Sequence, residues 1–215
     1  MLVIISDIHL GDGTTANSIS PTAFELFANR LRETAFYASF RQDGSYRPID
    51  TLHILLLGDI LDPLHSTIWL HTVPGAPNYA RPWTDTNSPA FAHILAETTK
   101  TILHVNRQSL EVLRKCANGQ TILLPPANAH HEPDRSSKER IPVNVRIYYM
   151  VGNHDWYYRL PGRAFDEIRK TVIDSMGLCN DSGPFPYELE EHPALYEILR
   201  PYQVFARHGD YFDKF

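Results

Sequence analysis

The sequence predicts a single α/β domain built around a mainly parallel β-sheet. Three short apolar runs, at residues 2–5, 50–57 and 145–151, have the composition of strands that are buried on both faces. Segments with helical periodicity separate the runs, so β-α-β crossovers would connect them. With 215 residues and 43% hydrophobic content, the chain is long enough for one substantial core. We therefore expect one domain over residues 1–215.

Helices are predicted between the strands. Ser20-Pro21 and Ser88-Pro89 each have the pattern of an N-cap followed by a first helical residue. Apolar residues recur at helical spacing after both, and again before Gly177, a typical helix-ending residue. The predicted helices span residues 21–44, 88–119 and 161–176. They would cover the sheet.

The C-terminal part of the chain has a different pattern. Residues 187–190, 195–199 and 203–206 are short runs separated by His192-Pro193 and Arg200-Pro201, which resemble tight turns. This change from β-α alternation favours antiparallel strands, so we expect a second sheet here.

Residues 63–89 are rich in proline and aromatic residues and have no periodicity. Loops of this length are usually functional or disordered, and the aromatic residues favour a packed loop. Because the segment leaves the sheet beside Asp59, we expect it to form part of the rim of a substrate cleft. His65 and His71 are interpreted as ordinary loop histidines.

Charge and cysteine content limit the classes of partner and compartment. A formal charge of -5 and a pI near 6.1 give no basic footprint for nucleic acid. Cys116 and Cys179 are too few for a disulfide framework, which favours a reducing cytoplasm. The first ten residues lack the basic leader of a signal peptide, and no apolar run reaches membrane-spanning length. We expect a cytoplasmic protein without a membrane partner.

Side chains able to bind metals follow the apolar runs. The four motifs are Asp7-Ile8-His9, Gly58-Asp59-Ile60-Leu61-Asp62, Gly152-Asn153-His154-Asp155 and His208-Gly209-Asp210. Parallel strands end at one edge of a sheet, where open α/β folds place their sites. On an extended backbone, Asp7 and His9 would point to the same side and could hold one cation. Each motif alone also fits a plain loop or a capped turn, but their joint order is rare.

In this order the motifs resemble those of the calcineurin-like metallophosphoesterases, from Ser6 to Asp213 with the proline-rich loop outside the resemblance. The resemblance implies a four-layer α/β/β/α sandwich whose first sheet is mixed but mainly parallel and whose second sheet is incomplete. It also implies two divalent metal ions. Carboxylate, imidazole and amide ligands without a thiolate suit Mn, Fe, Zn or Mg.

The resemblance assigns a role to seven residues. It implies that Asp7 and His9 bind the first metal, that Asp59 bridges both, and that Asn153 and His208 bind the second. His154 resembles the catalytic histidine of the family and Asp62 its acidic partner. The implied activity is hydrolysis of a phosphomonoester or phosphodiester by a metal-bridging hydroxide.

One motif of the family is missing. The family's last motif, Gly-His-x-His, would add one histidine to each metal, and the sequence contains no Gly-His dipeptide. Residues 1–215 would then be the N-terminal part of a longer protein or a degenerate relative, and the intact early motifs favour the first explanation. The alternative function is a catalytically impaired binding or assembly module. A nuclease is a third possibility, against which the acidic charge argues. Substrate, metal identity and oligomeric state stay open.

Overall fold

A parallel three-stranded sheet forms the centre of the protein. The computed structural model describes residues 1–15 and 18–212, so Asp213 lies outside the described residues. The strands are adjacent in the order β1-β2-β5, and both pairs are parallel. Their bounds are β1 (Leu2–Ile5), β2 (Thr51–Leu57) and β5 (Asn144–Met150). The predicted α/β class is confirmed, and this sheet is wholly parallel rather than mixed.

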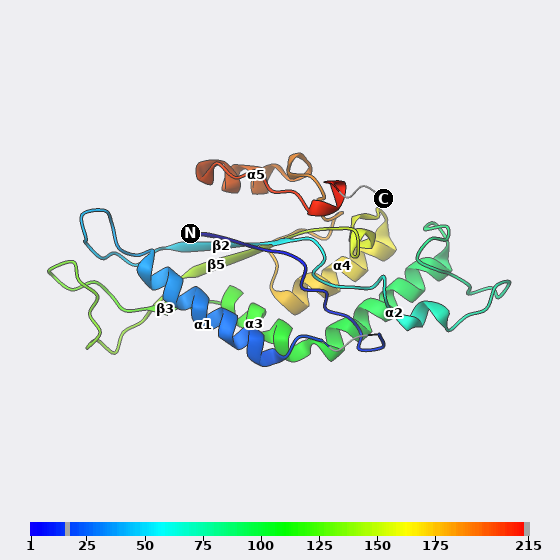
Figure 1. Cartoon of the computed structure of the whole chain (residues 1–215), viewed down its shortest axis with the longest axis horizontal. Helices are drawn as coiled ribbons and strands as arrows, with labels where there is room; N and C mark the ends of the chain where they lie inside the picture. Colours follow the sequence, from blue (N-terminus) through cyan, green and yellow to red (C-terminus); the bar gives the residue numbers. More distant parts are fainter. Residues whose placement is uncertain (16–17, 213–215) are drawn as a thin grey trace.

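Four helices cover one face of the sheet (Figure 1). They are α1 (Pro21–Tyr37), α2 (Pro89–Val105), α3 (Arg107–Ala117) and α4 (Arg163–Met176). Their apolar faces and the inward side chains of the strands form the larger of two buried clusters, which includes Leu56, Tyr149 and Met176. Burial of this apolar surface is the main stabilising contribution expected for a domain of this size.

The helix boundaries differ most from the predictions in two places. The first helix ends at Tyr37, because the chain turns back there and Phe40 bridges to Tyr46. The second predicted helix is divided at Asn106, which is buried. The Asn106 side-chain amide donates to the carbonyl oxygens of Ile102 and Gly11, both at 2.8 Å. This second bond ties the break between α2 and α3 to the loop after β1.

The prediction of strands in the C-terminal segment is wrong. Residues 187–206 contain α5 (Pro193–Leu199) between two 3-10 helices, η3 (Leu189–Glu191) and η4 (Arg200–Tyr202). Pro193 is the first residue of α5, and His192 Nδ1 accepts a hydrogen bond from the backbone amide of Leu195 at 3.1 Å. These capping features outweigh the strand-like composition of the short runs.

Helix α5 lies against the second face of the sheet, opposite the four larger helices (Figure 1). Leu195 and Leu199 pack there on Leu55, Tyr148 and Met150, forming the smaller buried cluster. The described residues therefore form three layers, α/β/α. A separate two-stranded antiparallel sheet joins β3 (Leu123–Leu124) to β4 (Ile141–Pro142).

The proline-rich segment is a packed loop, as its aromatic residues indicated. It contains η1 (Thr67–Leu70), where Trp69 is buried against Phe91 and Tyr157. Arg81 donates hydrogen bonds to the carbonyl oxygens of Trp69 and Thr72. The remaining 3-10 helices are η2 (Trp156–Arg159) and η5 (Gly209–Phe212).

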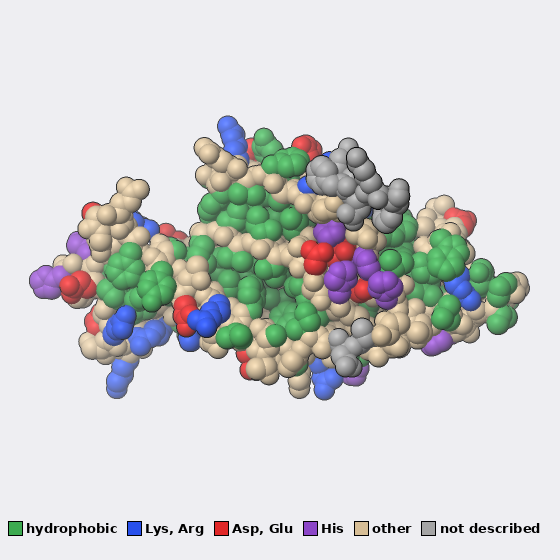
Figure 2. All heavy atoms as spheres, viewed as in Figure 1, with side chains coloured by type: hydrophobic (Ala, Val, Ile, Leu, Met, Phe, Trp, Pro, Cys, Tyr) green, Lys and Arg blue, Asp and Glu red, His purple; other side chains and the backbone are tan. Residues whose placement is uncertain are grey.

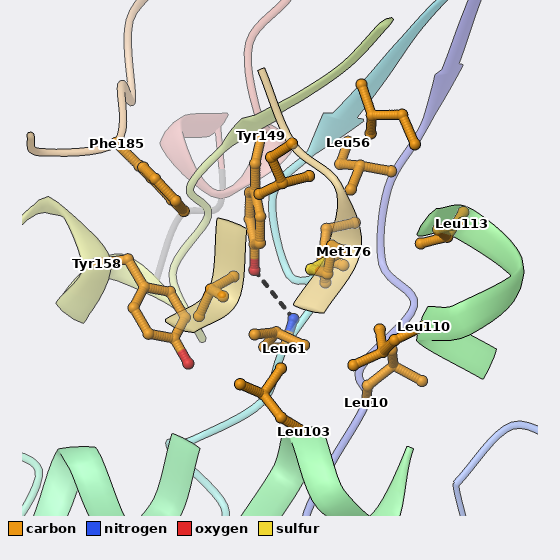
Figure 3. Close-up of a cluster of buried hydrophobic side chains, with 14 of the residues drawn as sticks. Leu10, Leu56, Leu61, Leu103, Leu110, Leu113, Tyr149, Tyr158, Met176 and Phe185 are labelled. Atoms are coloured by element: carbon orange, nitrogen blue, oxygen red, sulfur yellow. Dashed lines mark hydrogen bonds between the residues drawn. The ribbon is translucent and has the colours of Figure 1, made fainter. Parts of the chain in front are cut away.

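Beneath the carboxyl ends of the strands, the core is apolar and closely packed. Figure 3 shows Tyr149 directed toward Leu61, whose backbone amide donates to the tyrosine oxygen at 3.0 Å. The strand ends thus rest on a buried apolar core. Among residues 1–15 and 18–212, no helix is both long enough and apolar enough to cross a bilayer.

Candidate metal centre

The carboxyl ends of β1, β2 and β5 bring the predicted site residues together. Parallel pairing continues beyond the strands: Asp7 donates its backbone amide to Gly58 at 3.2 Å, and His9 donates to Asp59 at 2.9 Å. However, Asp7, His9 and Asp59 have φ angles of 55°, 49° and 54°. The expectation of an extended backbone at Asp7 and His9 is therefore wrong. Left-handed conformations of residues other than glycine cost free energy and are concentrated at functional sites.

Two glycines allow the strand ends to approach each other. Gly58 has a φ of 75°, and a Cβ atom there would lie 2.5 Å from His208 Nδ1. A Cβ atom on Gly152 would lie 2.8 Å from His208 Nε2 and closer still to Asp59 Oδ1. Real Cβ atoms do not approach other atoms this closely, so the site requires glycine at both positions.

Asp59 is at the centre of the cluster. Its side chain is buried, and its Oδ2 atom faces three imidazoles: Nε2 of His208 at 3.4 Å, of His9 at 3.8 Å and of His154 at 4.0 Å. Its Oδ1 accepts the backbone amide of His154 at 2.9 Å. Burial alone would raise the pKa of Asp59, but the hydrogen bonds from His208 and His154 outweigh it and lower the pKa. Asp59 is therefore an ionised carboxylate.

His208 is oriented with its Nε2 atom toward Asp59. Its Nδ1 lies 3.0 Å from the carbonyl oxygen of Leu57, which can only accept, so Nδ1 carries a proton. Its Nε2 lies 3.2 Å from Asn153 Oδ1. Without a metal, the hydrogen bond to Asp59 raises the pKa of His208 to about 9. This orientation, in which one ring nitrogen is fixed by a carbonyl and the other is directed at carboxylate and amide oxygens, is typical of metal-binding histidines.

A second buried carboxylate, Asp62, faces the Nδ1 atoms of His9 and His154, the two rings whose Nε2 atoms also face Asp59. His154 Nδ1 lies 3.3 Å from Asp62 Oδ1, and His9 Nδ1 lies 3.5 Å from Asp62 Oδ2. A third imidazole also reaches this carboxylate, because His65 Nδ1 is 2.9 Å from Oδ2. Burial works to raise the pKa of Asp62, but its hydrogen bonds with His65 and His154 lower it overall. Asp62 is thus also ionised.

Asp155 supports the site from below. It is fully buried, and its oxygens accept from the backbone amides of Gly152 at 2.6 Å and Ile60 at 2.9 Å, and from the Tyr149 hydroxyl at 2.5 Å. Complete burial raises the pKa of Asp155 to about 6. Asp155 thereby connects the turn after β5 to the turn after β2, which fixes the spacing between Asp59 and His154.

The cluster opens into a pocket of about 520 Å³. Figure 2 shows histidine and acidic side chains gathered on one face of the molecule, where this pocket lies. Of the seven predicted site residues, all but Asp62 line it, and Arg207 and Asp210 line it as well. The proline-rich loop contributes no lining residue among those described, and its His65 instead contacts Asp62 and His154.

Donor atoms in this arrangement could hold metal ions. Two donors bound to one cation at about 2.0–2.2 Å lie about 3–3.6 Å apart. The separations of His208 Nε2 from Asn153 Oδ1, 3.2 Å, and from Asp59 Oδ2, 3.4 Å, fall in this range. His9, at 3.8 Å from Asp59, is partly exposed and would need only a small rotation.

The donors can be grouped around Asp59 in two ways. Carboxylate and imidazole atoms of Asp7, Asp59 and His208 lie within 4.8 Å of one another, and so do those of His9, Asp59 and His154. In the first group, Asp7 lies with His208 rather than with His9, the residue with which the resemblance pairs it. The role of each donor stays a prediction.

Sequence reasoning missed two residues of the site. His65 was interpreted as an ordinary loop histidine because no motif includes it, and only the turn at Pro63 brings it back to Asp62. Asp155 was part of a recognised motif but received no role. Its position directly after the strand-end histidine was the available signal.

Comparison with other proteins provides no independent identification. Searches against protein-family models, curated proteins and solved structures found no match to this chain.

Proposed function

We propose that this chain is a metal-dependent phosphoesterase that binds two divalent cations, Mn, Fe, Zn or Mg, at the carboxyl ends of its parallel strands. The observation that carries the proposal is the surrounding of Asp59. One buried, ionised carboxylate faces the Nε2 atoms of three histidines that come from three separate segments of the chain. A buried carboxylate facing several imidazoles is a common arrangement in metal sites and a costly one without a function.

Asp59 would bridge the two ions, with Asp7 and His9 completing one site and Asn153 and His208 the other. When bound, two such ions lower the pKa of water and stabilise the charge of a phosphoryl group. The remaining coordination positions would face the pocket, where the substrate enters. Both glycines keep the protein donors close enough to share Asp59.

His154 and Asp62 would form an acid–base pair beside the ions. Asp62 holds the Nδ1 side of the His154 ring, so Nε2 remains directed toward Asp59 and the pocket. His154 can therefore donate a proton to the leaving oxygen of a phosphate ester.

The four-layer sandwich and the cellular context also belong to the proposal. On the α5 face, Ile4 of β1 is 37% exposed, and a second sheet packed there would cover it. The substrate would be a phosphate monoester or diester other than a nucleic acid, because a net charge of -5 disfavours binding of a polyanion. Cys116 and Cys179 are unbonded, which supports the proposal of a reducing, cytoplasmic compartment.

Hydrolysis of an aryl phosphate monoester and diester by the manganese-loaded protein tests the proposal. Wild type should hydrolyse at least one of them, and Asp59→Asn should reduce turnover to background. Asp50→Asn is the matched control, because Asp50 is exposed and lies just before the other end of β2. Full activity of Asp59→Asn, with circular dichroism showing an intact fold, would contradict the mechanism.

A metal-binding module with little catalysis is the second candidate. It is favoured by the absence of Gly-His-x-His from the sequence, which leaves fewer histidine donors than the resembled family has. Metal content after extensive dialysis separates the two functions. An enzyme of the proposed type should keep close to two ions per chain, whereas a module that keeps one or none would show no turnover.

A further inference from the structure

Asp62, His65 and His154 form a cluster that the dinuclear centre does not use. One oxygen of Asp62 and one nitrogen from each histidine lie within 4.8 Å of one another. Asp62 and His65 lie three residues apart at the start of the proline-rich loop, and His154 comes from the turn after β5. His65 joins this cluster through its ring and also donates its backbone amide to Asp62 at 3.2 Å.

The cluster has the spacing of a cation site. His65 Nδ1 lies 2.9 Å from Asp62 Oδ2, and His154 Nδ1 lies 3.3 Å from Asp62 Oδ1, so the two rings face the two oxygens of one carboxylate. Donors on one cation at about 2.0–2.2 Å lie about 3–3.6 Å apart. The His154 separation falls in this range and the His65 separation lies just below it, so a cation bound by the carboxylate and both rings would require only small side-chain movements. Both rings present their Nδ1 atoms to Asp62. The dinuclear donors of His208 and His9 are instead Nε2 atoms directed at Asp59.

Burial differs across the cluster in a way that suits an exchangeable ion. Asp62 is buried and ionised, whereas the His65 side chain is 58% exposed and that of His154 is 18% exposed. The buried charge of Asp62, which water screens poorly, would thus hold the ion. The exposed His65 side of the cluster would let the ion exchange with solvent. Two imidazoles and one carboxylate form the three-donor set found in open zinc sites, with one position left for water. Magnesium prefers oxygen ligands and would bind poorly here.

We propose that Asp62, His65 and His154 bind a third cation, preferentially zinc, and that this ion inhibits the enzyme. The inhibitory part rests on the proposed function, in which Asp62 and His154 form the acid–base pair. An ion on His154 Nδ1 and Asp62 breaks their hydrogen bond and adds positive charge beside the histidine. General acid–base catalysis contributes about 10²–10⁴-fold, so saturating zinc should lower turnover about a hundredfold or more.

Zinc stoichiometry tests the third site without reference to activity. Wild type, His65→Gln and His71→Gln are dialysed against the same free zinc concentration, and zinc per chain is measured by mass spectrometry. His71 is the matched control, because it is an exposed histidine on the same loop, outside the cluster. We expect three equivalents in wild type and His71→Gln and two in His65→Gln.

Equal zinc content in wild type and His65→Gln would overturn the third site. A difference of one equivalent would support it, even if the chain hydrolyses no phosphate ester and the proposed function fails. Zinc titration of the manganese-loaded enzyme then tests inhibition, with each variant normalised to its own activity before zinc. His65→Gln should raise the half-inhibitory zinc concentration about tenfold or more, as expected for loss of a ligand contact. Identical inhibition of wild type and His65→Gln would overturn the inhibitory role.

Discussion

Asp59 and Asp62 lie three residues apart in one turn, yet they contact opposite sides of the same imidazoles. His9 and His154 each direct Nε2 toward Asp59 and Nδ1 toward Asp62. Both carboxylates are buried, and hydrogen bonds keep both ionised. The difference lies in their other neighbours. Asp59 borders the open pocket with Asn153 and His208, whereas Asp62 lies under the proline-rich loop with His65.

Asp59 and Asp62 belong to one sequence motif, but their surroundings suit two different roles. A carboxylate open to the pocket and surrounded by further donors is suited to bridging metal ions. A carboxylate behind the rings is suited to orienting them and to holding a proton on one nitrogen. Substitutions at the two positions should therefore differ in their effect on metal content and on turnover.

The largest effect is expected for Asp59→Asn. Because Asp59 would be a ligand of both ions, this substitution should lower metal content from about two ions per chain to less than one. Turnover should then fall to background. Inductively coupled plasma mass spectrometry after dialysis measures the metal. Two retained ions in the folded variant would mean that Asp59 is not the bridging group.

Asp62→Asn should leave the two ions in place while reducing kcat. Loss of the charge that orients His154 should cost about 10²–10⁴-fold in kcat, the usual contribution of general acid–base catalysis. Metal analysis and steady-state kinetics are carried out on the same preparation. If Asp62→Asn instead lost metal as Asp59→Asn does, the two carboxylates would have one role rather than two.

Gly152→Ala should destabilise the folded protein through steric overlap around Asp59, without removing any donor atom. The new Cβ atom would collide with Asp59 and His208, and overpacking of this kind costs about 1–3 kcal/mol of the free energy of unfolding. Urea denaturation measures the loss. Gly209→Ala is the control, because a Cβ atom there would meet no atom within 4 Å. Equal stability of the two variants would show that the strand ends do not require a glycine at position 152.

The smallest effect is expected in the pH dependence of stability of the metal-free protein. The pKa of His208 rises from 6.5 to about 9 on folding, so its pairing with Asp59 stabilises the folded state fully below pH 6.5. That contribution should decrease as the pH rises from 6.5 to about 9. Urea denaturation at several pH values should show this slope in wild type and a smaller one in His208→Gln. An identical slope in both would exclude His208 as its source.

The sheet and most site residues were predictable because their signals are local. A buried strand followed by a glycine or an acid is visible in the sequence, and parallel pairing places such ends together. His65 was not predictable, since its contact with Asp62 depends on the course of an aperiodic loop. The segment containing α5 was misread because Leu195 and Leu199 fit either a short strand or one helical turn. Its capping by His192 and Pro193 decided the outcome.

Anomalous X-ray diffraction from crystals grown with manganese would test the central claim most directly. We expect two anomalous peaks about 3.5–4 Å apart, with an oxygen of Asp59 between them and His208 Nε2 bound to one of the ions. A single ion away from Asp59, or no ion within bonding distance of the Asp59 carboxylate, would contradict the dinuclear centre.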